Sequence, residues 1–196
     1  MLRPPRQFAN LALAWALAFV AVPALAEPLP DMGPAAGFTL TTQDGKTLSL
    51  AELRGKVVLL AFVYTSCTDV CLTETAKMVQ VQNGLGDAFG RDVWFVSVSM
   101  DPEVDTGEQL KHHARQFGAN LAGWTFLTGT PAQVERVAHD YGVVFRKVAS
   151  GDVEHNTMAS IVDGDGRLRV QYMGVEFDPK EMQTDIEGLM RKGNGR

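Results

Sequence analysis

Two uninterrupted apolar runs constrain the fold of this chain more than any other feature. Residues 56–64, KVVLLAFVY, and residues 93–100, VWFVSVSM, contain few polar side chains and are rich in β-branched and aromatic residues. Such runs are typical of strands that are buried on both faces of a sheet. A sheet that is covered on both faces needs helices on each side. The two runs therefore predict an α/β protein.

Helices and further strands alternate with these runs. The predicted helices follow the first strand to about residue 85 and then cover residues 105–118, 130–142 and 179–192. A third strand is expected at 124–129, two more within 156–174, and a hairpin around Asp44-Gly45. Asp105 or Thr106 is expected near the N-cap of the second helix, and Thr130 at that of the third. This order predicts a thioredoxin-like three-layer sandwich with a central mixed sheet and an N-terminal hairpin extension.

The first 26 residues have the composition of a secretory signal peptide. Arg3 and Arg6 form a positive n-region, an apolar run covers residues 11–22, and small residues stand at Ala24 and Ala26. We therefore expect cleavage after Ala26 and a periplasmic protein. The alternative is an uncleaved membrane anchor that leaves the domain facing the periplasm.

The rest of the chain is predicted to be a tether followed by one domain. Residues 27–36 are rich in Pro, Ala and Gly and are expected to be flexible, and residues 37–194 form the domain. The formal charge is −5, and it becomes −7 once the two arginines of the signal peptide are removed. An acidic domain without a Lys/Arg cluster is a poor binder of nucleic acid, so no nucleic-acid partner is expected.

Cys67 and Cys71 are the only cysteines of the chain, and three residues separate them. Cys67 follows the first buried strand, at the start of the predicted helix, where the partial positive charge of a helix N-terminus favours a thiolate. Cys71 would lie one turn further on the same face. The pair could exchange electrons through a reversible disulfide, hold a soft metal ion, or form a structural disulfide. The spacing alone leaves these three uses open.

A third ligand would favour a metal site, and four histidines are available. His112 and His113 lie in a polar helical stretch and are expected to face solvent, whereas His139 is expected to be a partly buried structural residue. His155 is different, because it follows a polar loop and stands directly before an apolar strand. In a thioredoxin-like fold this loop lies beside the start of the first helix. Mixed thiolate and imidazole ligands are typical of copper and zinc sites, which makes His155 a candidate ligand.

The chain resembles the SCO/SenC copper proteins over about residues 34–192. The matching segments are FVYTSCTDVC (62–71), VSMDPEVDT (98–106), YGVVF (141–145) and HNTMASIVDGDGRL (155–168). The resemblance implies a thioredoxin-like fold and one copper ion per chain, Cu(I) or Cu(II), with Cys67, Cys71 and His155 as ligands. The implied client is a copper enzyme such as the CuA centre of cytochrome c oxidase, to which such proteins deliver copper or whose thiols they keep reduced.

This chain departs from the family pattern at two positions. Thr68 and Leu72 stand where the family usually has proline. Neither residue would supply a ligand, but a proline that fixes φ at the helix start is missing. Asp69 and Asp101 are candidates for groups that contact the ligands, and Met158 is expected to be a packing residue.

Other functions remain as alternatives. The protein could be a thiol–disulfide oxidoreductase that acts on a partner's cysteines without transferring metal and is itself re-reduced by a thiol reductant. A thiol peroxidase would share the fold, but Tyr64 stands where such enzymes usually have threonine. A copper sensor or store would share the site.

Overall fold

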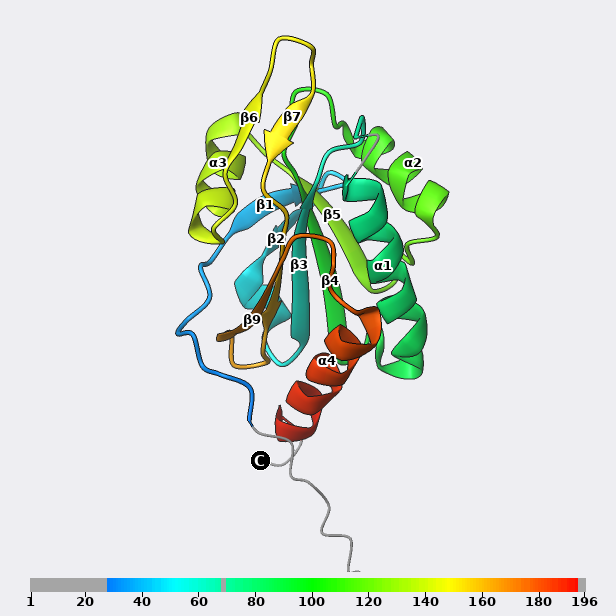
Figure 1. The fold of residues 1–196 in the computed structure, drawn as a ribbon, viewed down its shortest axis with the longest axis vertical. Helices are drawn as coiled ribbons and strands as arrows, with labels where there is room; N and C mark the ends of the chain where they lie inside the picture. Colours follow the sequence, from blue (N-terminus) through cyan, green and yellow to red (C-terminus); the bar gives the residue numbers. More distant parts are fainter. Residues whose placement is uncertain (1–27, 68–69, 194–196) are drawn as a thin grey trace, which may run out of the picture.

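A seven-stranded mixed sheet forms the centre of the protein (Figure 1). The computed structural model describes residues 28–67 and 70–193. The strand order is β2 (Thr47–Ser49), β1 (Thr39–Thr42), β5 (Trp124–Thr128), β4 (Val93–Ser99), β3 (Val57–Val63), β8 (Met158–Val162) and β9 (Leu168–Met173). Strands β3, β4 and β5 are parallel, and the other pairs are antiparallel. The expected sheet is confirmed.

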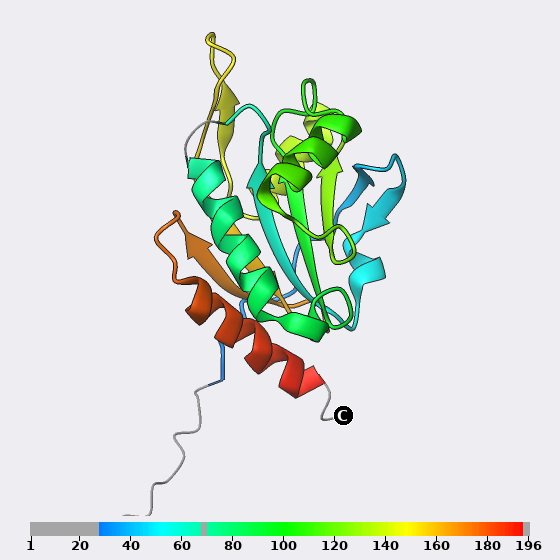
Figure 2. The ribbon, with the colours of Figure 1, turned by 90° about the vertical axis from the view of Figure 1, so that its right-hand side faces the viewer.

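Helices cover both faces of the sheet. The long helices are α1 (Val70–Gly84), α2 (Gly107–Phe117), α3 (Pro131–Asp140) and α4 (Pro179–Gly193), and two short 3-10 helices lie at Leu50–Leu53 and Gly86–Ala88. Helices α1, α2 and α4 pack on one face, and α3 packs on the other together with the hairpin of β6 (Phe145–Lys147) and β7 (Val153–His155) (Figures 1 and 2). The three-layer sandwich predicted from the sequence is confirmed.

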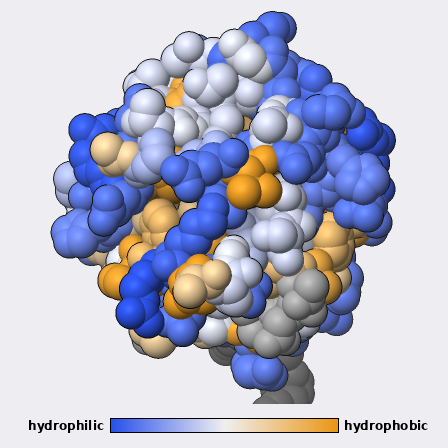
Figure 3. All heavy atoms as spheres, turned by 90° about the horizontal axis from the view of Figure 1, so that it is seen from above, coloured by the Kyte–Doolittle hydropathy of each residue, from blue (hydrophilic) through white to orange (hydrophobic). Residues whose placement is uncertain are grey.

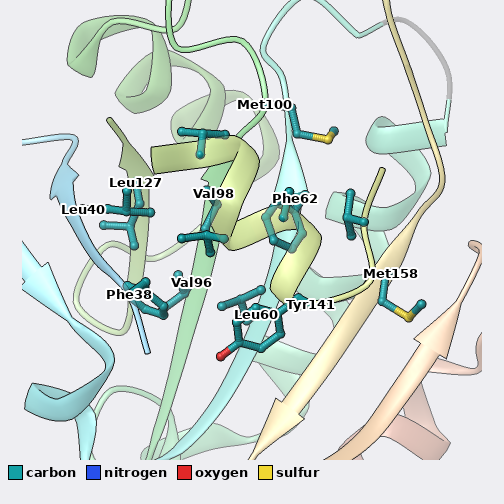
Figure 4. Packing of buried hydrophobic residues seen from close by; sticks show 14 of the residues in the cluster. Phe38, Leu40, Leu60, Phe62, Val96, Val98, Met100, Leu127, Tyr141 and Met158 are labelled. Carbon is teal, nitrogen blue, oxygen red and sulfur yellow. The ribbon is translucent and has the colours of Figure 1, made fainter. Parts of the chain in front are cut away.

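Strand β3 explains the first apolar run. All seven of its residues are buried, and they alternate between the two cores. Leu60 and Phe62 face the core beneath α3, where the ring of Phe62 lies 6.5 Å from that of Tyr141 (Figure 4). Leu59 and Ala61 face the core beneath α1, α2 and α4. Each face must be apolar because each is covered, so the run shows no alternation.

Local signals set the ends of α2 and α3 as expected. Thr106 and Thr130 are the N-caps, and each forms a reciprocal capping box with a glutamine three residues later. Gly118 ends α2 in the left-handed conformation, with φ 75°. The structure decides between the two candidate caps of α2, because Asp105 turns towards another part of the chain.

The β6–β7 hairpin was not predicted from the sequence. Residues 149–154 were expected to be a polar loop before His155, but β7 pairs with β6 in the register Phe145↔His155. His155 is therefore the last residue of β7 instead of following a loop. Three-residue strands with exposed polar side chains such as Arg146 and Glu154 carry too few apolar residues to produce a pattern.

The described part of the expected tether is bound to the domain. Met32 and Ala35 donate backbone hydrogen bonds to the chain at Leu168 and Gly166. Arg169 donates to the carbonyl oxygens of Leu29 and Pro30 and forms an ion pair with Asp163. The backbone groups of an edge strand need partners, and this segment supplies some of them. The predicted signal peptide lies outside the described residues, and within them no helix is long and apolar enough to span a membrane.

We predict that Arg169→Ala lowers the free energy of unfolding by about 2–4 kcal/mol. The side chains of Arg169 and Asp163 are only 13% and 10% exposed, so the substitution leaves a buried carboxylate without its cation. Denaturant-induced unfolding measures the effect. Arg91→Ala is the control, since it breaks an exposed ion pair with Asp92 and should change nothing measurable. Equal unfolding midpoints for Arg169→Ala and the wild type would contradict the prediction.

Candidate metal centre

The two cysteines lie at the carboxyl end of β3, where the chain passes from the sheet to α1. After β3 the chain turns, and the backbone N–H of Cys67 donates to the carbonyl oxygen of Tyr64 at 3.2 Å. Cys71 lies in the first turn of α1. Both cysteines are free thiols and both are buried. Thr68 and Asp69, between them, lie outside the described residues.

Asp105 holds the turn before Cys67 in place. Its carboxylate accepts hydrogen bonds from the backbone N–H and the hydroxyl of Thr65, the latter at 2.5 Å, and from the hydroxyl of Ser99 at 2.6 Å. Asp105 is fully buried, and this burial raises its pKa although the three hydrogen bonds oppose the shift. The segment after β4 is thereby joined to the turn after β3.

His155 reaches the cysteines from the β6–β7 hairpin. Its Nε2 lies 3.5 Å from the Sγ of Cys71, although 84 residues separate the two in sequence. Its Nδ1 lies 2.9 Å from the carbonyl oxygen of Val153. A carbonyl oxygen can only accept, so Nδ1 carries the proton, and in the neutral ring the lone pair of Nε2 then faces the sulfur. A ligating histidine is typically oriented in this way, by a hydrogen bond from its other ring nitrogen.

Asn156 fixes the base of the hairpin that carries His155. Its side chain accepts a hydrogen bond from the backbone N–H of Val144 at 2.7 Å and donates one to the carbonyl oxygen of Gly142 at 3.0 Å. The chain just before β6 is thus joined to the residue that follows β7. This connection sets the position of His155 relative to the sheet.

The environment of Cys71 disfavours a thiolate in the absence of a cation. Burial raises the pKa of its thiol, and the hydrogen bond and charge of the neighbouring Cys67 side chain raise it further. Glu74, one turn along α1, is also fully buried, and burial raises its pKa to about 8. Neither carboxyl oxygen of Glu74 has a hydrogen-bond partner. A bound metal cation would compensate the thiolate charge that this environment leaves unbalanced.

The donor atoms are of the kinds that bind a soft metal ion, but they do not yet surround a common metal position. The Sγ of Cys71 lies 3.5 Å from the Nε2 of His155, and the side chain of Cys67 is close enough to raise the pKa of Cys71, so two sulfurs and one imidazole nitrogen lie near one another. Among residues 28–67 and 70–193, no group of three His, Cys, Asp or Glu side chains is arranged to hold a metal ion as it stands. Binding through the three ligands therefore requires these side chains to move towards a common centre.

The other histidines lie away from this centre, and two of the expectations about them were wrong. His113 is buried against Phe117 and Phe126 rather than exposed. His139 is exposed rather than partly buried, with 83% of its side chain accessible. His112 is exposed as expected. Adjacent helical residues point in different directions, and a polar helix does not indicate by itself which of two histidines faces the core.

Two other residues near the strand ends were also considered in advance. Asp101 is buried, and its Oδ1 accepts a hydrogen bond from the Nζ of Lys147 at 2.8 Å, which links the end of β4 to the hairpin. Met158 is buried in the core beneath α3 (Figure 4) and is a packing residue, as expected.

Tyr64 and Asp105 are residues of the site that sequence reasoning missed. Tyr64 is buried, and its ring meets the imidazole of His155 edge to face, with 5.6 Å between centroids and an interplanar angle of 90°. In the sequence, Tyr64 stands out only as a departure from the peroxidase pattern, and Asp105 only as a candidate cap. The sequence does offer one signal for Asp105, which is its position in VSMDPEVDT just after a buried strand.

Comparison with known proteins decides the family. The SCO1/SenC family model matches residues 31–191. This chain belongs to the SCO1/SenC family. The SCO1 protein homolog of Bacillus subtilis is 37% identical to this SCO1/SenC protein over 145 residues, which cover 72% of this chain and 75% of the relative.

Solved SCO/SenC structures share the fold. BsSco, described as a member of the Sco family of cytochrome c oxidase assembly proteins that has a disulfide switch, matches with a TM-score of 0.73 and 31% identity, over 84% of this chain and 98% of BsSco. Bradyrhizobium japonicum ScoI, solved with copper bound, matches with a TM-score of 0.70 and 29% identity, over 80% of this chain and 99% of ScoI.

We predict that His113 makes this SCO/SenC protein less stable in acid. Burial lowers its pKa from 6.5 to about 4. Between these values the unfolded chain binds a proton that the folded protein does not, so stability falls as the pH falls, by about 2–3 kcal/mol over the whole window. Denaturant titrations at pH 7 and pH 4.5 measure the loss. Between these two pH values the free energy of unfolding of His113→Leu should fall less than that of the wild type. His112→Leu, at an exposed position, should behave like the wild type. If His113→Leu and the wild type show the same pH dependence, His113 is not the cause of the loss of stability in acid.

Proposed function

We propose that this protein binds one copper ion through Cys67, Cys71 and His155 and passes it to a copper enzyme. The observation that carries the proposal is the contact between Cys71 Sγ and His155 Nε2, in which the nitrogen lone pair faces the sulfur. Membership of the SCO1/SenC family and the likeness to a copper-bound ScoI support copper as the metal.

The donor set suits both oxidation states of copper. Cu(I) favours soft thiolates in low coordination, whereas Cu(II) favours nitrogen and oxygen donors and tetragonal geometry. Two sulfurs and one imidazole could hold either, with a solvent molecule completing the Cu(II) site. Release to a client would proceed by ligand exchange, in which each ligand here is replaced in turn by a ligand of the client.

The surface offers a route by which a client could reach the ligands. The sulfurs are buried, whereas His155 is half-buried and borders an open hollow of about 560 Å³ that Val144 and Phe145 also line. Seen from above, this end of the molecule has separate apolar patches on a mainly hydrophilic surface (Figure 3). We infer that exchange begins at His155.

The client that best fits is a cytochrome c oxidase subunit with a CuA centre, since the similar BsSco is described as belonging to a family of cytochrome c oxidase assembly proteins. We further propose that residues 1–26 export the protein to the periplasm. If this segment is retained as an anchor, the metal centre lies at the far end of the domain from the attachment point, because the described chain begins at the end opposite to the site (Figure 1).

We predict that the reduced mature protein binds one equivalent of copper, and that His155→Ala weakens Cu(II) binding by more than about 100-fold. Loss of a ligand should lower the metal affinity at least as much as loss of a group that hydrogen-bonds to a ligand, which lowers it about 10–100-fold. Competition titration and the Cu(II) absorption spectrum measure both. His139→Ala, at an exposed histidine, is the matched control. The three-ligand site is wrong if His155→Ala retains the wild-type affinity and spectrum.

Thiol–disulfide exchange is the second candidate function, because Cys67 and Cys71 are free and adjacent. A Cys67 thiolate would attack a partner's disulfide and release one partner thiolate. Cys71 would then displace the second partner sulfur, which leaves the partner reduced and a Cys67–Cys71 disulfide here. A thiol reductant would have to restore the pair.

For this second function we predict that Cys71→Ala traps a mixed disulfide between Cys67 and a partner bearing a disulfide, such as oxidised apo-CuA protein. The substitution removes the sulfur that would resolve the intermediate. Non-reducing electrophoresis followed by mass spectrometry identifies the adduct, and Cys67→Ala is the control that should trap none. Failure of Cys71→Ala to form an adduct while the wild type still reduces the partner would argue against this route.

A further inference from the structure

Tyr64 lies between the two halves of the proposed copper site. It is the residue that follows β3, and only 6% of it is exposed. Its carbonyl oxygen accepts a hydrogen bond from the backbone N–H of Cys67. Its backbone therefore belongs to the turn of residues 64–67, which we call the cysteine turn. Its ring contacts His155, which belongs to the hairpin. The residue therefore joins two segments that are far apart in sequence.

Besides the contact with Cys71, two further contacts hold the imidazole of His155, and they constrain different motions. The hydrogen bond from Nδ1 to Val153 favours one tautomer, but Val153 belongs to the same hairpin strand. The edge-to-face contact with Tyr64 comes from the sheet, with 5.6 Å between ring centroids. Aromatic rings favour this arrangement by electrostatics as well as by packing. The hydrogen bond thus fixes the imidazole relative to its own strand, and the contact with Tyr64 fixes it relative to the cysteine turn.

We propose that Tyr64 is a positioning residue of the copper site, whose ring holds the His155 imidazole so that Nε2 faces the Cys71 sulfur. This inference rests on the proposed function and adds to it the residue that orients the nitrogen ligand. The effect is specific for Cu(II), because Cu(II) depends on the imidazole more than Cu(I) does.

The test compares Tyr64→Leu, which removes the ring, with Tyr64→Phe, which keeps it. Tyr64→Leu should bind Cu(II) roughly 3- to 10-fold more weakly, lose the single nitrogen environment in its Cu(II) paramagnetic resonance spectrum, and change Cu(I) affinity less than about twofold. Tyr64→Phe should recover most of the wild-type behaviour. Tyr172→Leu is the matched control, because it removes a similar ring contact, with Phe177, away from the site.

A second readout needs no metal. Nitrogen-15 spectra of the metal-free wild type should show His155 as one tautomer, protonated at Nδ1, with proton contacts between its ring and that of Tyr64. Tyr64→Leu should keep this tautomer, because Val153 still accepts from Nδ1, but its imidazole signals should be broadened by averaging over ring orientations. Wild-type imidazole signals and a wild-type Cu(II) spectrum in Tyr64→Leu would overturn the proposal, and so would the absence of ring contacts in the wild type. If the wild type binds no copper, the proposed function fails, but the metal-free spectra still decide the role of Tyr64.

Discussion

The contact between Cys71 and His155 depends on where β3 ends. Because β3 is buried on both faces and held between β4 and β8, the turn that follows it has little freedom. Asp105 then fixes Thr65 within that turn. Cys67 and the first turn of α1 follow directly. Because this central strand is fixed, the two sulfurs lie in a defined place at its carboxyl end.

The histidine reaches the site from a separate element of the fold. The β6–β7 hairpin is not part of the main sheet. It is held by Asn156 at its base, by the ion pair of Lys147 with Asp101, and by the ring of Tyr64. Side-chain contacts of this kind are weaker and more local than a sheet ladder. A hairpin held by them could adjust as ligands close around copper, while the cysteine turn keeps its place.

The sequence predicted the elements that carry strong local signals. The buried strands β3 and β4, the caps Thr106 and Thr130 and the stop at Gly118 were all expected. The β6–β7 hairpin was missed because its strands are short and polar, and the side of the helix that His113 occupies was misjudged. The roles of Asp105 and Tyr64 depend on contacts across 40 and 91 residues, respectively. Such contacts are determined by the tertiary fold, so even the position of Asp105 just after a buried strand does not reveal its partners.

X-ray absorption of the copper-loaded, reduced mature protein tests the central claim most directly. We predict a copper ion with two sulfur neighbours at the distances of thiolate ligands and one nitrogen neighbour whose outer-shell scattering is that of an imidazole. The imidazole scattering should disappear in His155→Ala while the two sulfurs remain. Copper bound by nitrogen and oxygen alone, or the same imidazole scattering in His155→Ala, would contradict it.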